Sequence, residues 1–212
     1  MVENEPTEVG EMITKRINIF LLGNNKVGKT SFISRYLYDK FEIKYTPTIS
    51  LNSDFTPKSI IIDDILYLII FFDPTGNKSS IQHLTQFIKK SDGFIIMYDI
   101  TNKESFEAIP DWIKIVTDIK GEKIPIIILG NKVEKSSERK ISEEDGEKFK
   151  SDNIDFLEIS VRSRKNINEA VTKLFNKIVE NMPKKEKPVE IPIPEETIIN
   201  NDKLKEKKSC CF

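Results

Sequence analysis

The sequence predicts an α/β domain built on a mostly parallel, six-stranded sheet, with helices on both faces and one antiparallel edge strand. Short apolar runs recur along the chain, and each is followed by a polar turn and a helix-like stretch, which is the alternation of βα units. One further apolar run lies so close before its neighbour that the two are expected to form a hairpin. That hairpin supplies the antiparallel edge.

The individual elements follow from these runs. The expected strands are, in chain order, residues 17–22, 59–62, 67–72, 93–98, 125–129 and 156–159. Asp63 and Asp64 fall between the second and third strands and mark the hairpin turn. The expected helices are residues 28–39, 81–89, 104–119, 143–151 and 167–181. In the last helix a stripe of apolar residues at helical spacing is expected to face the core: Ile167, Ala170, Val171, Leu174, Ile178 and Met182.

The chain divides into three parts by composition. Residues 1–15 are an acidic extension that we expect to be flexible, residues 16–182 form the single α/β domain, and residues 183–212 form a disordered tail with four prolines. The first residues lack the apolar stretch of a secretion signal, and no apolar run approaches the roughly 20 residues that span a bilayer. The net charge is -1, so the chain has no excess of positive charge that would attract a nucleic acid. We therefore expect no nucleic acid as a partner.

A loop with a phosphate-binding pattern follows the first expected strand directly. It reads G-N-N-K-V-G-K-T, which fits G-x-x-x-x-G-K-[ST] and opens a helix. In such a loop the backbone N–H groups bind the α- and β-phosphates of a nucleotide. The Lys29 ammonium would bind the β- and γ-phosphates, and the Thr30 hydroxyl would bind Mg²⁺. The pattern predicts a P-loop NTPase domain whose nucleotide-binding residues include Gly23, Asn24, Asn25, Lys26, Val27, Gly28, Lys29 and Thr30. Adenine and guanine sites both use such a loop, so an ATP-using enzyme stays open at this point.

The segment after the strand at 125–129 bears on the choice of base. Asn131-Lys132-Val-Glu134 resembles the base-reading N-K-x-D motif of the small GTPases of the Ras superfamily. A carboxylate there accepts two hydrogen bonds from guanine that adenine cannot donate, and Glu134 supplies it on a stem one methylene longer. The resemblance implies that Asn131 ties this loop to the phosphate loop and that the Lys132 stem covers one face of the base.

The same resemblance extends to four further motifs in the family's order. Phe41 is placed where the family has an aromatic ring against guanine, and 45–49 matches the first switch, in which Thr48 would bind Mg²⁺ and the γ-phosphate. The segment 73–77 resembles the second switch, in which Asp73 would hold Mg²⁺ through water and the Gly76 N–H would reach the γ-phosphate. A last motif corresponds to the loop whose backbone amides touch guanine: Ser160, Val161 and Arg162.

Catalysis depends on a position where the sequence departs from the family. The resemblance implies catalytic roles for Lys29, Thr48 and the residue after the switch glycine, which is Asn77 here where the family has glutamine. An amide one methylene short misplaces the attacking water, and a shift of about 1 Å can lower a rate on the order of a hundredfold. Asn25, Lys26 and Pro74 also depart from the family's residues. We therefore expect slow GTP hydrolysis, and a GTP-binding scaffold without useful hydrolysis is the alternative.

The C-terminus resembles that of one branch of the superfamily. Cys210 and Cys211 are the only cysteines, and adjacent terminal cysteines are similar to the double geranylgeranylation signal of Rab proteins. The resemblance implies a Rab-like GTP/GDP switch in vesicle or membrane trafficking, lipid-anchored at the cytoplasmic face of a membrane with a soluble cytosolic pool. Its expected partners are prenylation enzymes at the cysteines, and effectors, an exchange factor and an activating protein at 41–52 and 73–90. We expect a monomer.

Overall fold

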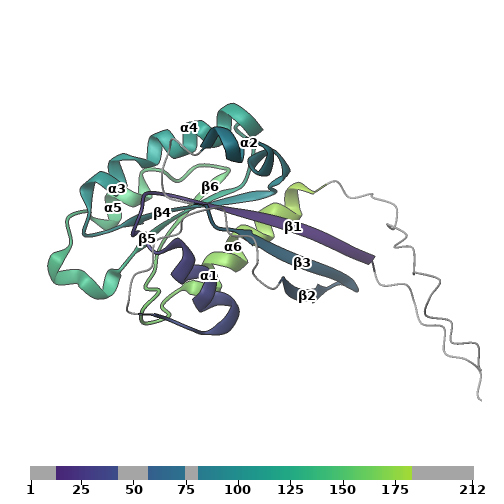
Figure 1. Cartoon of the computed structure of the whole chain (residues 1–212), viewed down its shortest axis with the longest axis horizontal. Helices are drawn as coiled ribbons and strands as arrows, with labels where there is room; N and C mark the ends of the chain where they lie inside the picture. The colour runs from purple at the N-terminus through teal and green to yellow at the C-terminus, as the bar shows by residue number, and fades with distance from the viewer. Residues whose placement is uncertain (1–12, 43–56, 75–80, 183–212) are drawn as a thin grey trace, which may run out of the picture.

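Six strands form one sheet in the order β2-β3-β1-β4-β5-β6, in which β2 runs antiparallel to β3 and the other neighbours are parallel (Figure 1). The computed structural model describes residues 13–42, 57–74 and 81–182. The strands are β1 (Ile13–Leu22), β2 (Lys58–Ile62), β3 (Ile65–Phe72), β4 (Gly93–Asp99), β5 (Ile126–Asn131) and β6 (Ile154–Glu158). The predicted mostly parallel sheet with one antiparallel edge strand is confirmed.

Helices cover both faces of this sheet, as predicted. They are α1 (Lys29–Tyr38), α2 (Ile81–Lys90), α3 (Lys103–Glu107), α4 (Ile109–Lys120), α5 (Glu143–Glu147) and α6 (Ile167–Asn181), with a 3₁₀ helix at Val133–Glu138. In Figure 1, α1 and α6 lie below the sheet, and α2, α3 and α4 lie above it. Helix α6 has the predicted bounds.

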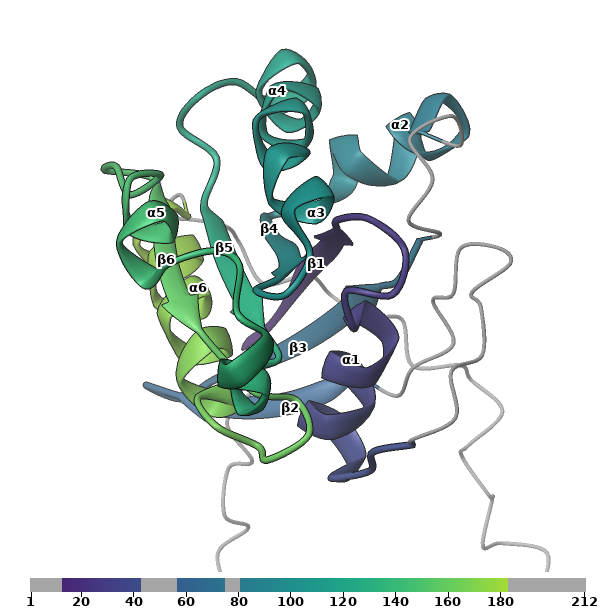
Figure 2. The ribbon, with the colours of Figure 1, turned by 90° about the vertical axis from the view of Figure 1, so that its left-hand side faces the viewer.

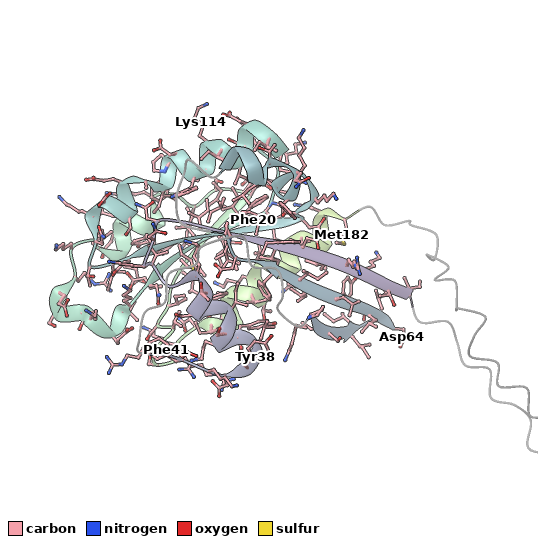
Figure 3. All side chains as sticks on the ribbon, in the orientation of Figure 1. Phe20, Tyr38, Phe41, Asp64, Lys114 and Met182 are labelled. Atoms are coloured by element: carbon pink, nitrogen blue, oxygen red, sulfur yellow. The ribbon has the colours of Figure 1, made fainter. Side chains whose placement is uncertain are left out.

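Alternation along the strands divides the core into two layers. In β1, Ile17, Ile19 and Leu21 face α1 and α6, whereas Phe20 and Leu22 face α2 and α4. All five side chains are buried, and Figure 3 shows Phe20 in the middle of the sheet. Successive side chains of a strand point to opposite faces of the sheet. Both faces of this central strand are apolar because helices cover it above and below.

The hairpin and the first strand are longer than predicted. Strand β1 begins at Ile13 and β3 at Ile65, and these two residues are partners in the parallel register. Asp63 and Asp64 have φ angles of 49° and 60°, which are the two left-handed residues of a two-residue hairpin turn. Pairing with β3 therefore extends β1 into a segment whose own sequence is not apolar enough to indicate a strand.

Two predicted helices differ in the structure. The helix expected at 104–119 is two helices that meet at Ala108, because Pro110 has no N–H to donate and is tolerated only in the first turn of α4. The helix expected at 143–151 ends at Glu147, where tight turns from Phe149 and Lys150 replace helical bonds.

Candidate functional site

The carboxyl ends of the parallel strands bring the predicted motifs to one edge of the sheet. Strand β1 leads into the loop 23–28, β3 into Asp73, β5 into Lys132 and β6 into the loop 159–162. Figure 2 views the molecule from this end of the sheet, where the loop between β1 and α1 connects the tip of β1 to the start of α1. Ligands of open α/β sheets bind at this edge, so the topology assembles one site from four separate segments.

The loop between β1 and α1 depends on two glycines. Gly23 has a φ of 127° and Gly28 a φ of 106°, a region that other residues rarely adopt. A Cβ at Gly23 would collide with the carbonyl oxygen of Met97, and one at Gly28 would lie 2.5 Å from Asn131 Nδ2. The two glycines of the motif therefore let β4 and β5 approach the loop closely.

Lys29 is buried inside this loop, with 7% of its surface exposed. Its ammonium donates to the carbonyl oxygens of Gly23, at 2.8 Å, and Asn24, at 3.1 Å. Burial lowers the pKa of Lys29 to about 8, although the charge of Asp73 acts in the opposite direction. The site thus holds a desolvated cation, which an anionic ligand can stabilise.

Thr30 and Asp73 form the second part of the site. The Thr30 hydroxyl donates to Asp73 Oδ2 at 2.5 Å, and Asp73 is fully buried. Burial raises the pKa of Asp73, opposed by the bond from Thr30 and the charge of Lys29. Asp73 Oδ1 is also buried and accepts no hydrogen bond from the described residues. An orphaned carboxylate oxygen beside a hydroxyl is a suitable donor set for a hard cation such as Mg²⁺.

A metal here would need ligands beyond these two side chains. Within residues 13–42, 57–74 and 81–182 there is no group of three or more His, Cys, Asp or Glu side chains that could hold a metal ion. Mg²⁺ commonly keeps several waters and takes phosphate oxygens beside one or two protein ligands. The Thr30 and Asp73 pair therefore fits Mg²⁺ only in company with a phosphate ligand.

Asn131, the last residue of β5, joins two loops of the site. Its Nδ2 donates to the Val27 carbonyl at 2.8 Å, and its Oδ1 accepts from the Val161 N–H at 3.1 Å. The contact that the sequence predicts between this motif and the phosphate loop is therefore present. Both ends of a buried amide are satisfied by backbone groups 104 and 30 residues away, which fixes the two loops against each other.

Lys132 contacts the same loop from the next position. Its ammonium donates to the Lys26 carbonyl at 2.9 Å and pairs with Asp99 at 2.7 Å. Its backbone is left-handed, with a φ of 74°, so the chain turns sharply after β5. The Lys132 stem therefore crosses from β5 to the phosphate loop.

The other predicted residues differ in their surroundings. Glu134 is exposed at the start of the 3₁₀ helix, and Phe41 is half-buried after α1. Ser160 is buried and its hydroxyl accepts from the Ser163 N–H at 2.9 Å, whereas Arg162 is exposed. Five predicted residues lie outside the described part of the chain: Thr48, Gly76, Asn77, Cys210 and Cys211.

Two residues that contact the site have no counterpart among the sequence predictions. Trp112, in α4, donates its indole N–H to Asn24 Oδ1 at 3.2 Å, and Arg35, in α1, donates to the carbonyl oxygens of Val161 and Arg162. Neither belongs to a local pattern. The only available signal is that Trp112 is the single tryptophan of the chain.

The described helices give no indication of a membrane span: none of them is both long and apolar enough to cross a bilayer.

Comparison with known proteins identifies relatives over most of the domain. The sequence model of the Ras family matches residues 18–180. The chain is 32% identical over 165 residues to the rat GTP-binding protein Rab-3D. That match covers 77% of this chain and 74% of the rat protein. The chain is also 32% identical over 194 residues to human EF-hand calcium-binding domain-containing protein 4B. That match covers 91% of this chain but spans only 25% of the human protein.

Proposed function

Because this chain belongs to the Ras family of small GTPases and is Rab-like within it, we propose that it binds GTP and GDP with Mg²⁺ and acts as a switch in membrane trafficking. The observation that carries the proposal is the pair of Asn131 bonds, one to the phosphate loop at Val27 and one to the loop at Val161. They support the proposal because they would hold its phosphate half and its base half at a fixed separation. A nucleotide is the ligand that has both parts.

The phosphate half of the proposed site uses Lys29, Thr30 and Asp73. Lys29 would exchange its two carbonyl partners for β- and γ-phosphate oxygens, and loop N–H groups and the start of α1 would hold the remaining charge. Thr30 and Asp73 would hold Mg²⁺, which neutralises charge on the phosphates when bound. In this proposal the N–H groups of Thr48 and Gly76 would sense the γ-phosphate.

The base half uses residues from the segments that follow β5, β6 and α1. Glu134 would accept two hydrogen bonds from guanine, the Lys132 stem and Phe41 would cover the two faces of the ring, and the 160–162 loop would donate its amides to the base. The exposed carboxylate of Glu134 supports this assignment, because it is available at the start of the 3₁₀ helix.

Base choice has a direct test. The nucleotide that co-purifies with the full chain should be GDP or GTP, and a hundredfold excess of ATP should leave bound labelled GTP in place. The matched variant Glu134→Ala should lose guanine preference, since adenine makes no use of this carboxylate. Efficient displacement of GTP from the wild type by ATP would instead favour an ATP-using P-loop enzyme.

For hydrolysis we propose slow turnover, with Asn77, Lys29 and Thr48 as the catalytic residues. Asn77 would orient the attacking water, and Lys29 and Thr48 would hold the γ-phosphate against it. The second candidate is a GTP-binding scaffold without useful hydrolysis, favoured by Asn77 and by Pro74, which follows Asp73 directly. Single-turnover phosphate release should be slow in the wild type and faster in Asn77→Gln. Absence of cleavage in both proteins, even with an activating protein, would establish the scaffold.

Membrane attachment is proposed through Cys210 and Cys211. Two geranylgeranyl chains give stable anchoring where one chain is marginal, and the basic residues of the last ten positions would favour an anionic cytoplasmic leaflet. Mass spectrometry of the protein from eukaryotic cells should find two added lipids, and Cys210→Ser with Cys211→Ser should release it from membranes. An unmodified wild-type terminus would contradict this part of the proposal.

A further inference from the structure

Arg35 uses its guanidinium to hold the loop that leaves β6. It lies in α1, six residues after Lys29, and its side chain is only 14% exposed. Nε donates to the Val161 carbonyl at 3.0 Å and one terminal nitrogen donates to the Arg162 carbonyl at 3.3 Å. Two successive carbonyls of one loop are therefore bound by a single planar group.

The rest of the guanidinium is fixed by the end of α1. The other terminal nitrogen donates to the Asp39 backbone carbonyl at 2.8 Å and to its carboxylate at 3.0 Å. Asp39 ends the helix in a left-handed conformation and its second carboxylate oxygen pairs with Arg164 at 2.8 Å. Phe41 follows, with its ring 5.6 Å below the guanidinium. Figure 3 shows Phe41 near the end of α1, on the opposite side of the molecule from Lys114.

These bonds set the direction of the peptide groups in the loop. In a trans peptide the N–H points away from the C=O, so holding the Val161 carbonyl toward α1 turns the Arg162 N–H to the other side. The Val161 N–H already bonds Asn131 Oδ1. Asn131 thus holds the peptide group before Val161, and Arg35 holds the one after it.

The fold of α1 does not depend on this contact alone. Phe32 and Ile33 are fully buried in the core layer that α1 shares with α6 and the sheet. Apolar burial therefore attaches the helix to the domain, while the donors of Arg35 go to loop carbonyls and to the helix end. Loss of the Arg35 bonds should therefore leave α1 attached to the domain.

We propose that Arg35 is a positioning residue for purine recognition, which fixes the peptide group between Val161 and Arg162 so that the Arg162 N–H meets the oxygen at position 6 of guanine. This inference rests on the proposed function. Helix α1 would then join the two halves of the site as one rigid element, because it begins with Lys29 and Thr30 and holds the loop 159–162 through Arg35. An amino group at position 6, as in adenine, would face the Arg162 N–H as a second donor and be rejected.

The test compares GDP and ADP affinity, with Mg²⁺, in the full chain and three variants. In Arg35→Ala the ratio of GDP to ADP affinity should fall about tenfold, since one oriented hydrogen bond is lost. Arg35→Lys should fail to restore the ratio, because an ammonium cannot hold both carbonyls in a planar fork. Lys177→Ala, which removes a 20% exposed lysine paired with Asp155 away from this loop, should leave the ratio unchanged.

The pattern across nucleotides separates positioning from general damage. Loss of stability alone would lower the affinity for GDP and ADP together, as Lys29→Ala should through the shared phosphates. A GDP-to-ADP affinity ratio within twofold of wild type in both Arg35 variants, or full rescue of the ratio by lysine, would overturn the inference about Arg35. The proposed function would still stand in that case if the wild type prefers guanine. If Arg35→Ala does not fold, Arg35→Lys decides. A wild type without guanine preference would overturn both.

Discussion

Lys29 and Asp73 are opposite charges that the fold buries within one site, and neither is fully compensated by the described residues. The ammonium of Lys29 has only carbonyl partners at hydrogen-bond distance, and one oxygen of Asp73 has none. Burial lowers the pKa of Lys29 and raises the pKa of Asp73, and both shifts favour the neutral form of the side chain. Unsatisfied buried charge of this kind is expected where a charged ligand completes the environment.

The pKa of Lys29 predicts how nucleotide affinity depends on pH. In the nucleotide-free protein this pKa is lowered to about 8, and bound phosphates would raise it, so binding takes up a proton at pH values above 8. GDP affinity should then fall as pH rises from 8 to 9, by up to about tenfold per pH unit. Calorimetric titration with GDP at pH 7, 8 and 9 measures this change in affinity. Lys29→Met, which binds more weakly, should lack this part of the pH dependence.

Asp73 leads to a prediction about metal dependence. Asp73→Asn keeps the size of the side chain and removes the charge, so the bond from Thr30 can persist while the metal site is lost. In the wild type, EDTA should accelerate GDP release at least tenfold. In Asp73→Asn release should already be fast, and EDTA should change it less than twofold. An equal EDTA response in both proteins would mean that Asp73 does not contribute to metal binding.

At the scale of elements, two helices and one strand that are distant in sequence hold the loops of the site. Helix α4 contacts the phosphate loop through Trp112, α1 holds the loop 159–162 through Arg35, and β6 is tied to the end of the 3₁₀ segment through Glu158. The Pro110 break matters here, because it starts α4 as a separate helix and Trp112 lies in its first turns. The site is therefore braced by regular elements rather than by its loops alone.

Trp112 should report nucleotide binding by its fluorescence. It is the single tryptophan, it is 1% exposed, and its N–H bonds Asn24 in the phosphate loop. Loading nucleotide-free protein with GDP should change the emission of Trp112, because the bound phosphates change the charge next to the loop that Trp112 contacts. Asn24→Ala should reduce the change to less than half. Equal spectra before and after loading of the wild type would show that the bond does not respond to the ligand.

The Arg139–Glu158 pair should be important for stability. Arg139 donates through two nitrogens to the two carboxylate oxygens at 2.5 Å and 2.7 Å, and the Glu158 side chain is 6% exposed. Arg139→Ala would leave a buried carboxylate unpaired and should lower the free energy of unfolding by about 2–3 kcal/mol. Lys114→Ala, whose pair with Asp118 is exposed, should change it by less than about 0.5 kcal/mol. Urea unfolding of the two variants makes the comparison.

At the scale of the whole molecule, the site is one edge of a sheet that two core layers hold rigid. The apolar layers lie on the two faces of the strands, and the charged residues lie where the strands end. A ligand that bridges the loops at this edge binds the folded state and not the unfolded chain. Stability and ligand concentration should therefore be linked.

This linkage predicts a large effect of ligand on thermal unfolding. Mg²⁺ and GDP at about 100 times the dissociation constant should add about 2.7 kcal/mol to the free energy of unfolding. For a domain of this size that raises the melting temperature by roughly 5–10 °C. Removal of the metal with EDTA should abolish most of the gain. A melting temperature that does not depend on either addition would contradict the proposed nucleotide site.

Local patterns in the sequence determined a large part of this protein. The G-x-x-x-x-G-K-[ST] run, the buried strands and the stripe of α6 could be predicted because each depends on residues that are neighbours along the chain or one helical turn apart. The antiparallel edge was predictable for the same reason, since its turn has only two residues. The early start of β1 was not, because it follows from pairing with β3 and not from its own residues.

The tertiary structure alone decided which residues brace the site. Arg35 and Val161 are 126 residues apart, and Trp112 and Asn24 are 88 apart. Arginine on a helix usually faces solvent, and a buried tryptophan N–H usually has a hydrogen-bond partner that its own sequence neighbours do not identify, so neither residue type indicates which loop is bound. Their role arises because a parallel sheet brings the ends of β1, β5 and β6 together at one edge, where α1 and α4 pass within hydrogen-bond distance of the loops.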